Sequence, residues 1–289
     1  MMVDEAEHHA RRAVILGGRG FVGRAVSAAF TMANWPSVSL GTRDCDLLDP
    51  NSVSLLGSLL GPADTIVYSA ARAPARERSD VLANVTMTTH LVEGLNRAGV
   101  RRLIVISSDS VYGEIGGLLT ELSPVAPTTV HGEMHALREG LCTRDFHGSI
   151  AFVRPPGIYG PGDPHDAYGP NRFVRSAWRE GVIPLLGEGL AQRDHIAVED
   201  VADLVTRVAH VEFDGVINAA TGQSISFAAL ASVVAESAPR PCAIVRVGEE
   251  SPPTSRAYDV AKLQREFPGF TCRSLTSGVR DFFTSLNRA

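Results

Sequence analysis

Two histidines and a serine are the side chains of this sequence best suited to proton chemistry. His131 and His135 stand four residues apart in the segment 130–146, whose pattern predicts a helix, and Ser108 follows the apolar segment 103–106. Residues four apart share a helix face, and imidazole titrates near neutral pH. We therefore expect His131 to act as acid or base at a substrate oxygen, with Ser108 hydrogen-bonded to the same oxygen and His135 nearby.

The same two histidines allow other interpretations. With Asp109 they could hold a metal ion, although their spacing differs from His-Glu-x-x-His and no other third ligand is evident, so we predict no metal site. They could also be half-buried polar residues of a protein that binds a cofactor and catalyses nothing. Two charged imidazoles one helical turn apart disfavour each other, so we expect at most one charge. A further alternative is that another residue is the acid: Tyr112, Tyr159 or Glu133.

A glycine-rich turn near the start of the chain predicts a dinucleotide site. Three glycines recur at three-residue intervals between the apolar segment 13–16 and a predicted helix at 21–30. Glycine lets the backbone approach a pyrophosphate, and a helix N-terminus offers free amide groups to it. The alternative is a glycine-rich turn without a ligand. The residues that we expect to contact the phosphates are Gly17, Gly20, Phe21, Val22 and Gly23.

The end of the second predicted strand bears on which dinucleotide binds. An acidic residue there usually binds the ribose hydroxyls of NAD. Here Gly41 and Thr42 occupy that end, and Arg43 could pair with a 2′-phosphate. We therefore expect NADP. NAD is the alternative, because a shift of one or two residues in the strand end would bring Asp44 into position, and Arg43 would then be a solvated loop residue.

Short apolar segments alternate with longer amphipathic ones through the first half of the chain. This alternation predicts a doubly wound parallel α/β sheet, the Rossmann architecture, with helices on both faces. We expect strands at 13–16, 38–40, 65–68, 103–106 and 150–153, and helices at 21–30, 50–60, 78–98 and 130–146. On the last helix we expect Val130, Met134, Leu137 and Leu141 to face the core, and a neighbouring stripe to face the cofactor cleft: His131, His135, Arg138 and Cys142.

After Arg154 the sequence becomes rich in proline and glycine, which indicates loops. We predict a dinucleotide-binding domain at 13–155 and a smaller, interleaved, mainly substrate-binding part at 156–289, with some segments returning to the sheet. Residues 1–12 are expected to form a flexible tail, in which His8 and His9 take no part in the site. Later elements are expected at 173–179, 198–209, 216–218, 227–236, 260–267 and 275–286.

The composition argues against several classes of protein. The 289 residues carry 27 basic and 32 acidic side chains without a basic block, which disfavours nucleic-acid binding. No apolar segment is long enough to span a membrane, and the N-terminus lacks the apolar core of a signal peptide. Four separated cysteines favour a reduced, cytoplasmic setting over a disulfide framework or a zinc site. They are Cys45, Cys142, Cys242 and Cys272.

Several motifs follow the glycine turn in a fixed order: Asp46-Leu47, Tyr68-Ser69-Ala70-Ala71, Asn84, Ser107-Ser108-Asp109-Ser110-Val111-Tyr112-Gly113, Arg154-Pro155-x-x-x-Tyr159-Gly160-Pro161-Gly162 and Arg193-Asp194-His195-Ile196-Ala197-Val198-Glu199-Asp200. Together they resemble the extended short-chain dehydrogenase/reductases, the NAD-dependent epimerase/dehydratase family that acts mostly on nucleotide sugars. The resemblance implies that Ser108 is catalytic and that the adenine and nicotinamide ends of the cofactor lie beside Asp46, Leu47, Ala70, Ala71 and Pro155.

For the substrate, the resemblance implies a nucleotide sugar whose phosphates lie near Asn171, Arg193 and Arg256. A fork-shaped guanidinium suits a diphosphate. The alternative is that these arginines are structural, with Arg193 tied to Asp194 or Asp200.

The sequence departs from the family at its catalytic helix. The family motif Tyr-Gly-x-Ser-Lys-x-x-x-Glu maps onto residues 131–139, where His131 replaces the tyrosine and His135 the lysine. In the family the tyrosine transfers the proton, and the lysine lowers its pKa and holds the ribose. The resemblance thus implies an NAD(P)-dependent reductase or epimerase of a nucleotide-linked keto sugar, and a catalytically silent cofactor-binding protein is the alternative. It also implies a homodimer formed through the helices at 78–98 and 130–146.

Overall fold

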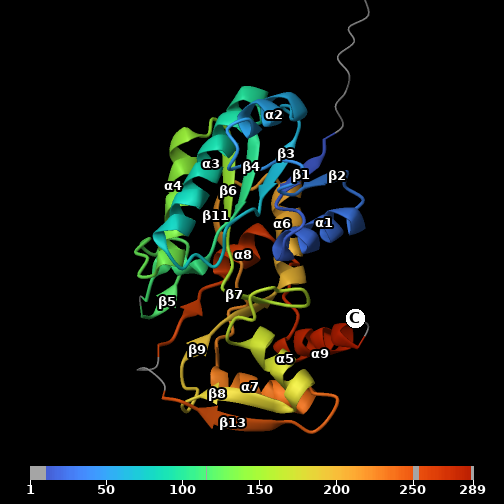
Figure 1. The fold of residues 1–289 in the computed structure, drawn as a ribbon, viewed down its shortest axis with the longest axis vertical. Helices are drawn as coiled ribbons and strands as arrows, with labels where there is room; N and C mark the ends of the chain where they lie inside the picture. Colours follow the sequence, from blue (N-terminus) through green and yellow to red (C-terminus); the bar gives the residue numbers. More distant parts are fainter. Residues whose placement is uncertain (1–10, 115, 250–253, 288–289) are drawn as a thin grey trace, which may run out of the picture.

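Six parallel strands form the central sheet of the computed structural model, which describes residues 11–114, 116–249 and 254–287. The strand order is β11-β6-β4-β3-β1-β2, and Figure 1 shows the sheet in the upper part of the molecule. The predicted doubly wound α/β fold is confirmed. The strands are β1 (Ala13–Leu16), β2 (Ser37–Leu40), β3 (Thr65–Tyr68), β4 (Arg102–Ile106), β6 (Ser149–Arg154) and β11 (Gly215–Asn218).

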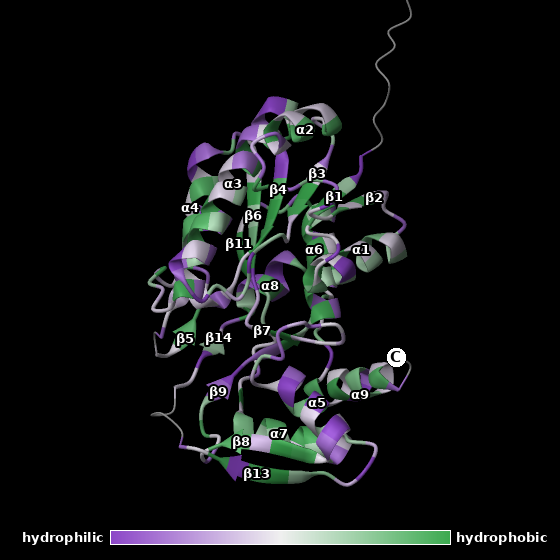
Figure 2. Ribbon diagram, in the orientation of Figure 1, coloured by the Kyte–Doolittle hydropathy of each residue, from purple (hydrophilic) through white to green (hydrophobic). Residues whose placement is uncertain are grey.

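Helices cover both faces of this sheet. On one face α1 (Phe21–Met32) packs against α6 (Val198–His210), and on the other α3 (Arg78–Ala98) lies between α2 (Ser52–Leu59) and α4 (Val130–Asp145) (Figure 1). Alternate residues of β1 enter the two hydrophobic cores, because successive side chains of a strand point to opposite faces. Figure 2 shows the hydrophobic residues concentrated on the central strands. None of the described helices combines the length and the apolar character needed to cross a membrane.

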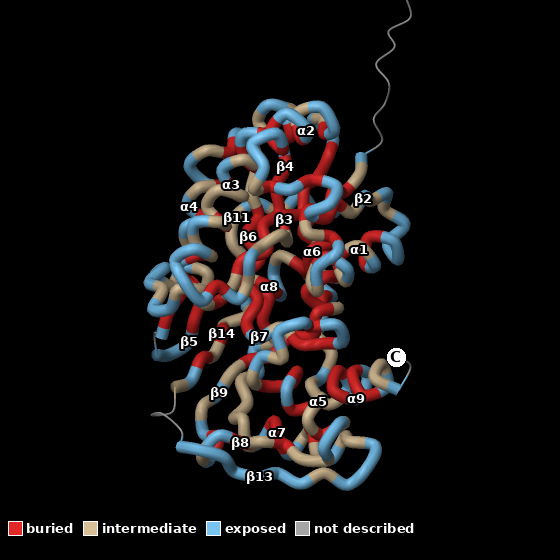
Figure 3. The backbone as a smooth tube through the Cα atoms, in the orientation of Figure 1, coloured by how far each residue is buried: buried red, intermediate tan, exposed pale blue. Residues whose placement is uncertain are grey.

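A smaller layer lies at the carboxyl ends of the strands. There α5 (Pro170–Glu180), α7 (Phe227–Ser237) and α9 (Leu275–Leu286) enclose a third core against β8 (Val182–Leu186). The sequence pattern did not predict β8 or its partner β13 (Ala243–Val247), whose residues are all exposed (Figure 3). The remaining elements are η1 (Asp109–Tyr112), β5 (Leu118–Leu119), β7 (Gly157–Tyr159), β9 (Gln192–Arg193), β10 (His195–Ala197), β12 (Ile225–Ser226), β14 (Ala257–Tyr258) and α8 (Ala261–Glu266).

The predicted orientation of α4 is partly wrong. Leu137 is 47% exposed, Val130 and Leu141 are half-buried, and only Met134 of the predicted apolar stripe is buried. The neighbouring stripe faces inward instead: His135, Arg138 and Cys142 are all buried. The reason is that the inner face of α4 meets the carboxyl ends of β3 and β4, where backbone carbonyl groups and the ring of Tyr68 accept a polar partner.

The predicted tail at residues 1–12 falls mostly outside the described residues, which begin at residue 11, and so do His8 and His9. Arg12 is described and is held in place, because its Nε donates to Asp64 Oδ1 over 2.8 Å and a second nitrogen donates to the Leu59 carbonyl. Residue 12 is therefore not part of a flexible tail.

Candidate active site and cofactor cleft

The glycine turn between β1 and α1 is packed too closely for side chains. Gly17 has φ 85°, and a Cβ atom there would lie 2.5 Å from the Ala70 nitrogen. A Cβ on Gly23 would lie 2.1 Å from the Gly17 carbonyl oxygen. The Gly20 cap has no side-chain hydrogen bond, and the first turn of α1 holds no acidic residue. Its amides, which include those of Phe21 and Val22, lack helical partners and can bind an anion.

A cavity of about 500 Å³ opens beside this turn. Gly17 and Gly20 line it. The lining also includes Ala70 and Ala71 after β3 and Asp46-Leu47 after β2. A bare glycine backbone, a free helix N-terminus and an adjoining cavity fit the pyrophosphate and adenosine half of a dinucleotide. The predicted cofactor residues that line this cavity are Gly17, Gly20, Asp46, Leu47, Ala70 and Ala71.

Two arginines line this cavity, Arg19 and Arg72, and neither is the one predicted. Arg43 is exposed and outside the cavity lining, whereas Arg19 and Thr42 belong to it. The stem of Arg19 crosses the end of β2, where a Cβ on Gly41 would lie 2.8 Å from its Cδ. An Arg19 nitrogen lies 3.0 Å from Asp44 Oδ2, and this carboxylate accepts a 2.8 Å hydrogen bond from the Gly41 amide. A basic residue inside the glycine turn was the signal that could have identified Arg19.

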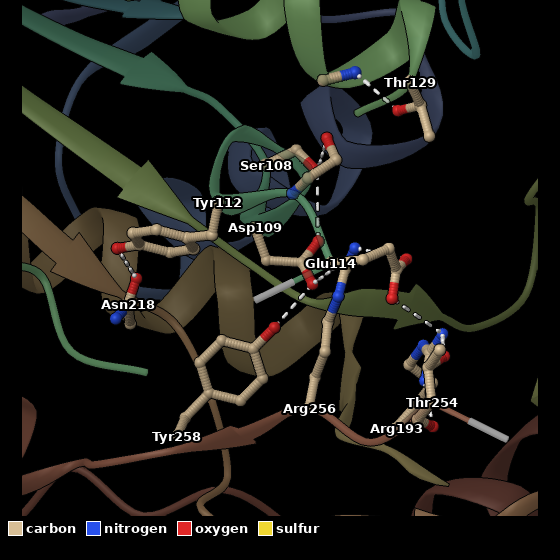
Figure 4. Close-up of polar contacts among 12 residues, drawn as sticks. Ser108, Asp109, Tyr112, Glu114, Thr129, Arg193, Asn218, Thr254, Arg256 and Tyr258 are labelled. Atoms are coloured by element: carbon tan, nitrogen blue, oxygen red, sulfur yellow. Dashed lines mark hydrogen bonds and ion pairs between the residues drawn. The ribbon is translucent and has the colours of Figure 1, made fainter. Parts of the chain in front are cut away.

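The serine run at the end of β4 forms a tight cap. Ser108 Oγ accepts hydrogen bonds from the Ser110 amide over 3.1 Å and from the Ser110 hydroxyl over 2.8 Å. It donates to Asp109 Oδ1 over 3.3 Å (Figure 4). The Ser108 hydroxyl therefore caps the N-terminus of η1, and its own proton points toward Asp109.

The two histidines lie against each other in the first turns of α4, with ring centroids 4.7 Å apart and an interplanar angle of 89°. The helix is capped by Thr129, whose hydroxyl accepts from the Gly132 amide. The Ala75 amide donates to His131 Nδ1 over 3.3 Å, and Arg138 approaches His135 Nδ1 at 3.4 Å. Burial lowers the pKa of His131, and burial followed by the charge of Arg138 lowers the pKa of His135. Both directions favour neutral rings.

Two buried arginines behind the histidines have different partners. Arg154 lies 2.5 Å from Glu139 Oε2, and Ser107 donates to Glu139 Oε1. Arg138 is 1% exposed and donates to the carbonyls of Ala70 and Ile106, while its guanidinium lies 4.3 Å from the ring centroid of Tyr68. Glu139, the glutamate that the sequence keeps from the family motif, therefore forms its ion pair with Arg154. Arg138 is hydrogen-bonded to backbone carbonyls instead.

A second cavity of about 230 Å³ lies on the other side of Asp109, and Arg193 and Arg256 line it. Arg256 donates to Asp109 Oδ2 over 3.0 Å and to Glu114 Oε1 over 2.9 Å. The Tyr258 hydroxyl donates to the same Asp109 oxygen over 2.5 Å (Figure 4). The structure thus brings two predicted substrate arginines to one cavity and adds two acidic partners that the sequence did not reveal.

The alternative anchors proposed for Arg193 are wrong. Its guanidinium donates to the Thr254 carbonyl and hydroxyl, over 2.8 and 2.7 Å. Asp194 instead accepts from Thr221 and Gly222, and Asp200 binds Arg273. The third predicted substrate residue, Asn171, lines the same cavity but uses its amide to bind the Gly160 nitrogen and the Ile158 carbonyl.

His195 is a cavity residue that sequence reasoning did not single out. It is 8% exposed, lines the 230 Å³ cavity and packs edge-on against Phe227 with centroids 5.9 Å apart. Neither ring nitrogen makes a hydrogen bond of good geometry to the described residues. Burial lowers its pKa to about 4. A histidine directly before the apolar residues 196–198 of the Arg193–Asp200 motif was the available signal.

The other candidate acids are enclosed or remote. The Tyr112 hydroxyl donates to Asn218 Oδ1 over 2.7 Å, Tyr159 is 1% exposed within the third core, and Glu133 is exposed on α4. The Pro155 carbonyl accepts from the Asp109 amide over 3.1 Å, so Pro155 holds the backbone of the serine run. Among residues 11–114, 116–249 and 254–287, no three histidine, cysteine or acidic side chains are grouped to hold a metal ion.

A model of the "NAD dependent epimerase/dehydratase family" matches residues 13–220. The chain belongs to this family. The family resemblance inferred from the motifs is thereby confirmed, and the match spans the glycine turn, the serine run and the histidine helix.

Comparisons with individual proteins agree with this membership. The chain is 28% identical over 177 residues to UDP-glucose 4-epimerase of Mycolicibacterium smegmatis, covering 56% of this chain and 55% of that protein. It is 24% identical over 253 residues to GDP-L-fucose synthase of Sinorhizobium fredii, covering 78% and 79%. The chain spans about half the length of most curated relatives that it matches.

Solved structures share the fold across nearly the whole chain. MoeE5 in complex with UDP-glucuronic acid and NAD has a TM-score of 0.84 and 26% identity, with 96% of this chain and 99% of that chain covered. RMD from Pseudomonas aeruginosa complexed with NADPH has a TM-score of 0.81 and 22% identity, with 97% and 100% covered. Proteins of this fold thus bind either dinucleotide.

Proposed function

We propose that this protein is an NAD(P)-dependent reductase or epimerase that acts on a nucleotide-linked keto sugar or a similar carbonyl compound. The observation that carries the proposal is the position of the serine run. Ser108 follows β4 at the carboxyl edge of the sheet, where the cofactor cavity opens, and its neighbour Asp109 lines the cavity that holds Arg193 and Arg256. A substrate bound by these arginines would extend toward the cofactor across Ser108.

The substrate class rests on the chemistry of the second cavity and on the relatives. Two guanidinium groups in one small cavity suit a diphosphate. UDP-glucuronic acid and UDP-glucose are bound in structures of MoeE5, which has the same fold. Asn171 contributes by holding the Gly160 loop rather than by direct contact, because its amide is already engaged.

The proposed chemistry is hydride transfer at a carbon that bears an oxygen. A bound nicotinamide dinucleotide would supply or accept the hydride. Ser108 and His131 would serve the substrate oxygen, and His135 would lie beside the ribose, as the family register implies. Pro155 fixes Asp109 from behind through its carbonyl. Since Ser108 Oγ already accepts two hydrogen bonds, its own proton, which is directed at Asp109 over 3.3 Å, is the group that would donate to the substrate carbonyl.

For the cofactor we propose NADP, with NAD as the alternative. Support comes from Arg19, a cation of the glycine turn that lines the cofactor cavity beside the end of β2, and not from Arg43, which is exposed and outside the cavity lining. We also propose a homodimer through α3 and α4. The exposed leucines Leu82 on α3 and Leu137 on α4, 67% and 47% exposed, would be covered in it.

The proposal is tested with the purified chain, NADPH or NADH, and a panel of 4-keto and ordinary nucleotide sugars. Turnover is followed by loss of the reduced-nicotinamide absorbance and by product analysis. We expect His131→Phe to lower kcat at least about 100-fold, as loss of an oxyanion donor does, and to leave the cofactor dissociation constant unchanged. Glu133→Gln, an exposed change in the same helical turn, is the matched control. Cofactor binding without turnover on the whole panel would favour the silent, cofactor-sensing alternative.

A further inference from the structure

The Nδ1 atoms of His131 and His135 face groups that can only donate a hydrogen bond. His131 Nδ1 receives the backbone amide of Ala75 over 3.3 Å. His135 Nδ1 lies 3.4 Å from an Arg138 nitrogen, and a guanidinium has N–H groups but no acceptor. A neutral imidazole carries one proton, so each Nδ1 must supply the lone pair and each proton must be on Nε2.

The groups around the pair disfavour a second proton on either ring. The charged and titratable side chains that face them are Arg138 from α4 itself, Asp109 from the end of β4 and His165 from the loop after β7, with the Tyr68 phenol of β3 behind Arg138. Asp109 is the one acid among them, and it is already bound by Arg256 and Tyr258. Its negative charge is therefore largely compensated on the side away from the histidines.

Arg138 is a permanent charge in this arrangement. Its nitrogens donate to the Ala70 and Ile106 carbonyls over 3.0 and 3.3 Å, and Tyr68 covers its face. Within the part of the chain that the structure describes, no carboxylate lies within ion-pair distance of it. A guanidinium does not deprotonate in proteins, so its field acts on His135 at every accessible pH.

We propose that Arg138 is a positioning residue that, together with the Ala75 amide, sets His131 and His135 as two neutral N–H donors instead of an acid and base pair. The assignment deepens the proposed function, but it concerns proton positions that exist before any substrate binds. Rings with Nδ1 occupied and Nε2 protonated can donate to a carbonyl oxygen and have no lone pair for a hydroxyl proton. A substrate oxygen that meets these Nε2 groups is therefore expected to be a carbonyl oxygen.

The proton positions are measured by long-range ¹H–¹⁵N correlation on full-length protein labelled with ¹⁵N-histidine. Single His→Phe variants at 131 and 135 assign the two rings, and a free N-acetylhistidine amide in the same buffer is the titrating reference. We expect Nδ1 of both rings to resonate as an unprotonated nitrogen from pH 8 to pH 5, while the free imidazole titrates near a pKa of about 6.5. A proton on Nδ1 of His135, or titration of His135 together with the free imidazole, would overturn the proposal.

Two substitutions separate the role of Arg138 from simple packing. Arg138→Met should raise the titration midpoint of His135 by about one pH unit, and Arg138→Lys should keep it low. An unchanged His135 in Arg138→Met would contradict the positioning role, and if that variant does not fold, the wild-type tautomers and Arg138→Lys still decide. Because these readouts need no substrate, a failure of the proposed function would leave the histidine assignment standing, and the reverse also holds.

Discussion

Two buried arginines on either side of the cleft have hydrogen-bond partners of different charge. Arg138, under α4, is bound by the carbonyls of Ala70 and Ile106. Arg256, beside the substrate cavity, is bound by the carboxylates of Asp109 and Glu114. Carbonyl dipoles satisfy the hydrogen bonds of a guanidinium without cancelling its charge, whereas carboxylates cancel it. The α4 side therefore keeps a positive field, and the substrate side is locally neutral.

This difference suggests different tasks for the two regions. An uncancelled charge can act on neighbours such as His135 without moving. A cation that already has carboxylate partners binds a diphosphate only when the phosphate replaces or rearranges one of them. Glu114, 41% exposed at its side chain, is the partner that water can solvate, and so it is the one that we expect to leave.

The largest effect is expected from removing each arginine in turn. Arg256→Met should lower the free energy of unfolding by about 3–5 kcal/mol, because it leaves the buried Asp109 without its cation. Arg138→Met should lower it by only about 1–2 kcal/mol, because two carbonyl groups lose their hydrogen-bond donor and no charge is left unpaired. Urea denaturation at pH 7.5 measures both. Equal costs would mean that carbonyls and carboxylates stabilise these two arginines alike.

The acidic partners offer a control for that comparison. Glu114→Ala should cost less than about 1 kcal/mol, since its carboxylate is partly solvated. If Glu114→Ala proved as destabilising as Arg256→Met, the assignment of Glu114 as the exchangeable partner would be wrong.

Acid should destabilise both regions, because each contains a buried neutral histidine beside an arginine. His195, near Arg193, has its pKa lowered by burial to about 4, and the pKa of His135 is lowered as well. The unfolded chain binds protons below its histidine pKa of about 6.5, whereas the fold does not, so stability falls as the pH drops from 6.5 toward 4. His195 alone accounts for on the order of 3 kcal/mol at pH 4.

Denaturation at pH 7.5 and pH 4.5 measures this loss. His195→Phe should remove much of the pH dependence, and the exposed control His147→Gln should leave it unchanged. The same slope in wild type and His195→Phe would show that His195 is charged in the fold or exposed to water.

The smallest effect concerns a third arginine, which is neither buried nor fully paired. Arg19→Ala should weaken NADP binding about 10-fold and NAD binding hardly at all, because a charge-assisted contact to the 2′-phosphate is lost. Arg43→Ala is the matched control, because Arg43 lies on the neighbouring loop after β2 and outside the cavity lining. Calorimetric titration with both cofactors measures the ratio, and equal losses for NAD and NADP would assign Arg19 to the pyrophosphate or the fold instead.

Much of the fold could be predicted because its signals are local. The helix at 78–98 was predicted with the observed ends, and Gly99, with φ 70°, ends it as expected. The strands β8 and β13 were not predicted, because Pro184 interrupts β8 and every residue of β13 is exposed. We predicted Arg43 and missed Arg19, because the order of residues along the chain does not show that the Arg19 side chain crosses the end of β2.

The sequence by itself determined the family, the parallel sheet, the glycine turn and the loss of the Tyr/Lys pair, since each depends on residue types at short spacing. Only the tertiary structure decided which atoms meet. The amide of Ala75 reaches His131 from 56 residues away, and Asp109 and Arg256 meet across 147 residues. Protonation and charge depend on such contacts and on exclusion of water, so they emerge only once the chain is folded.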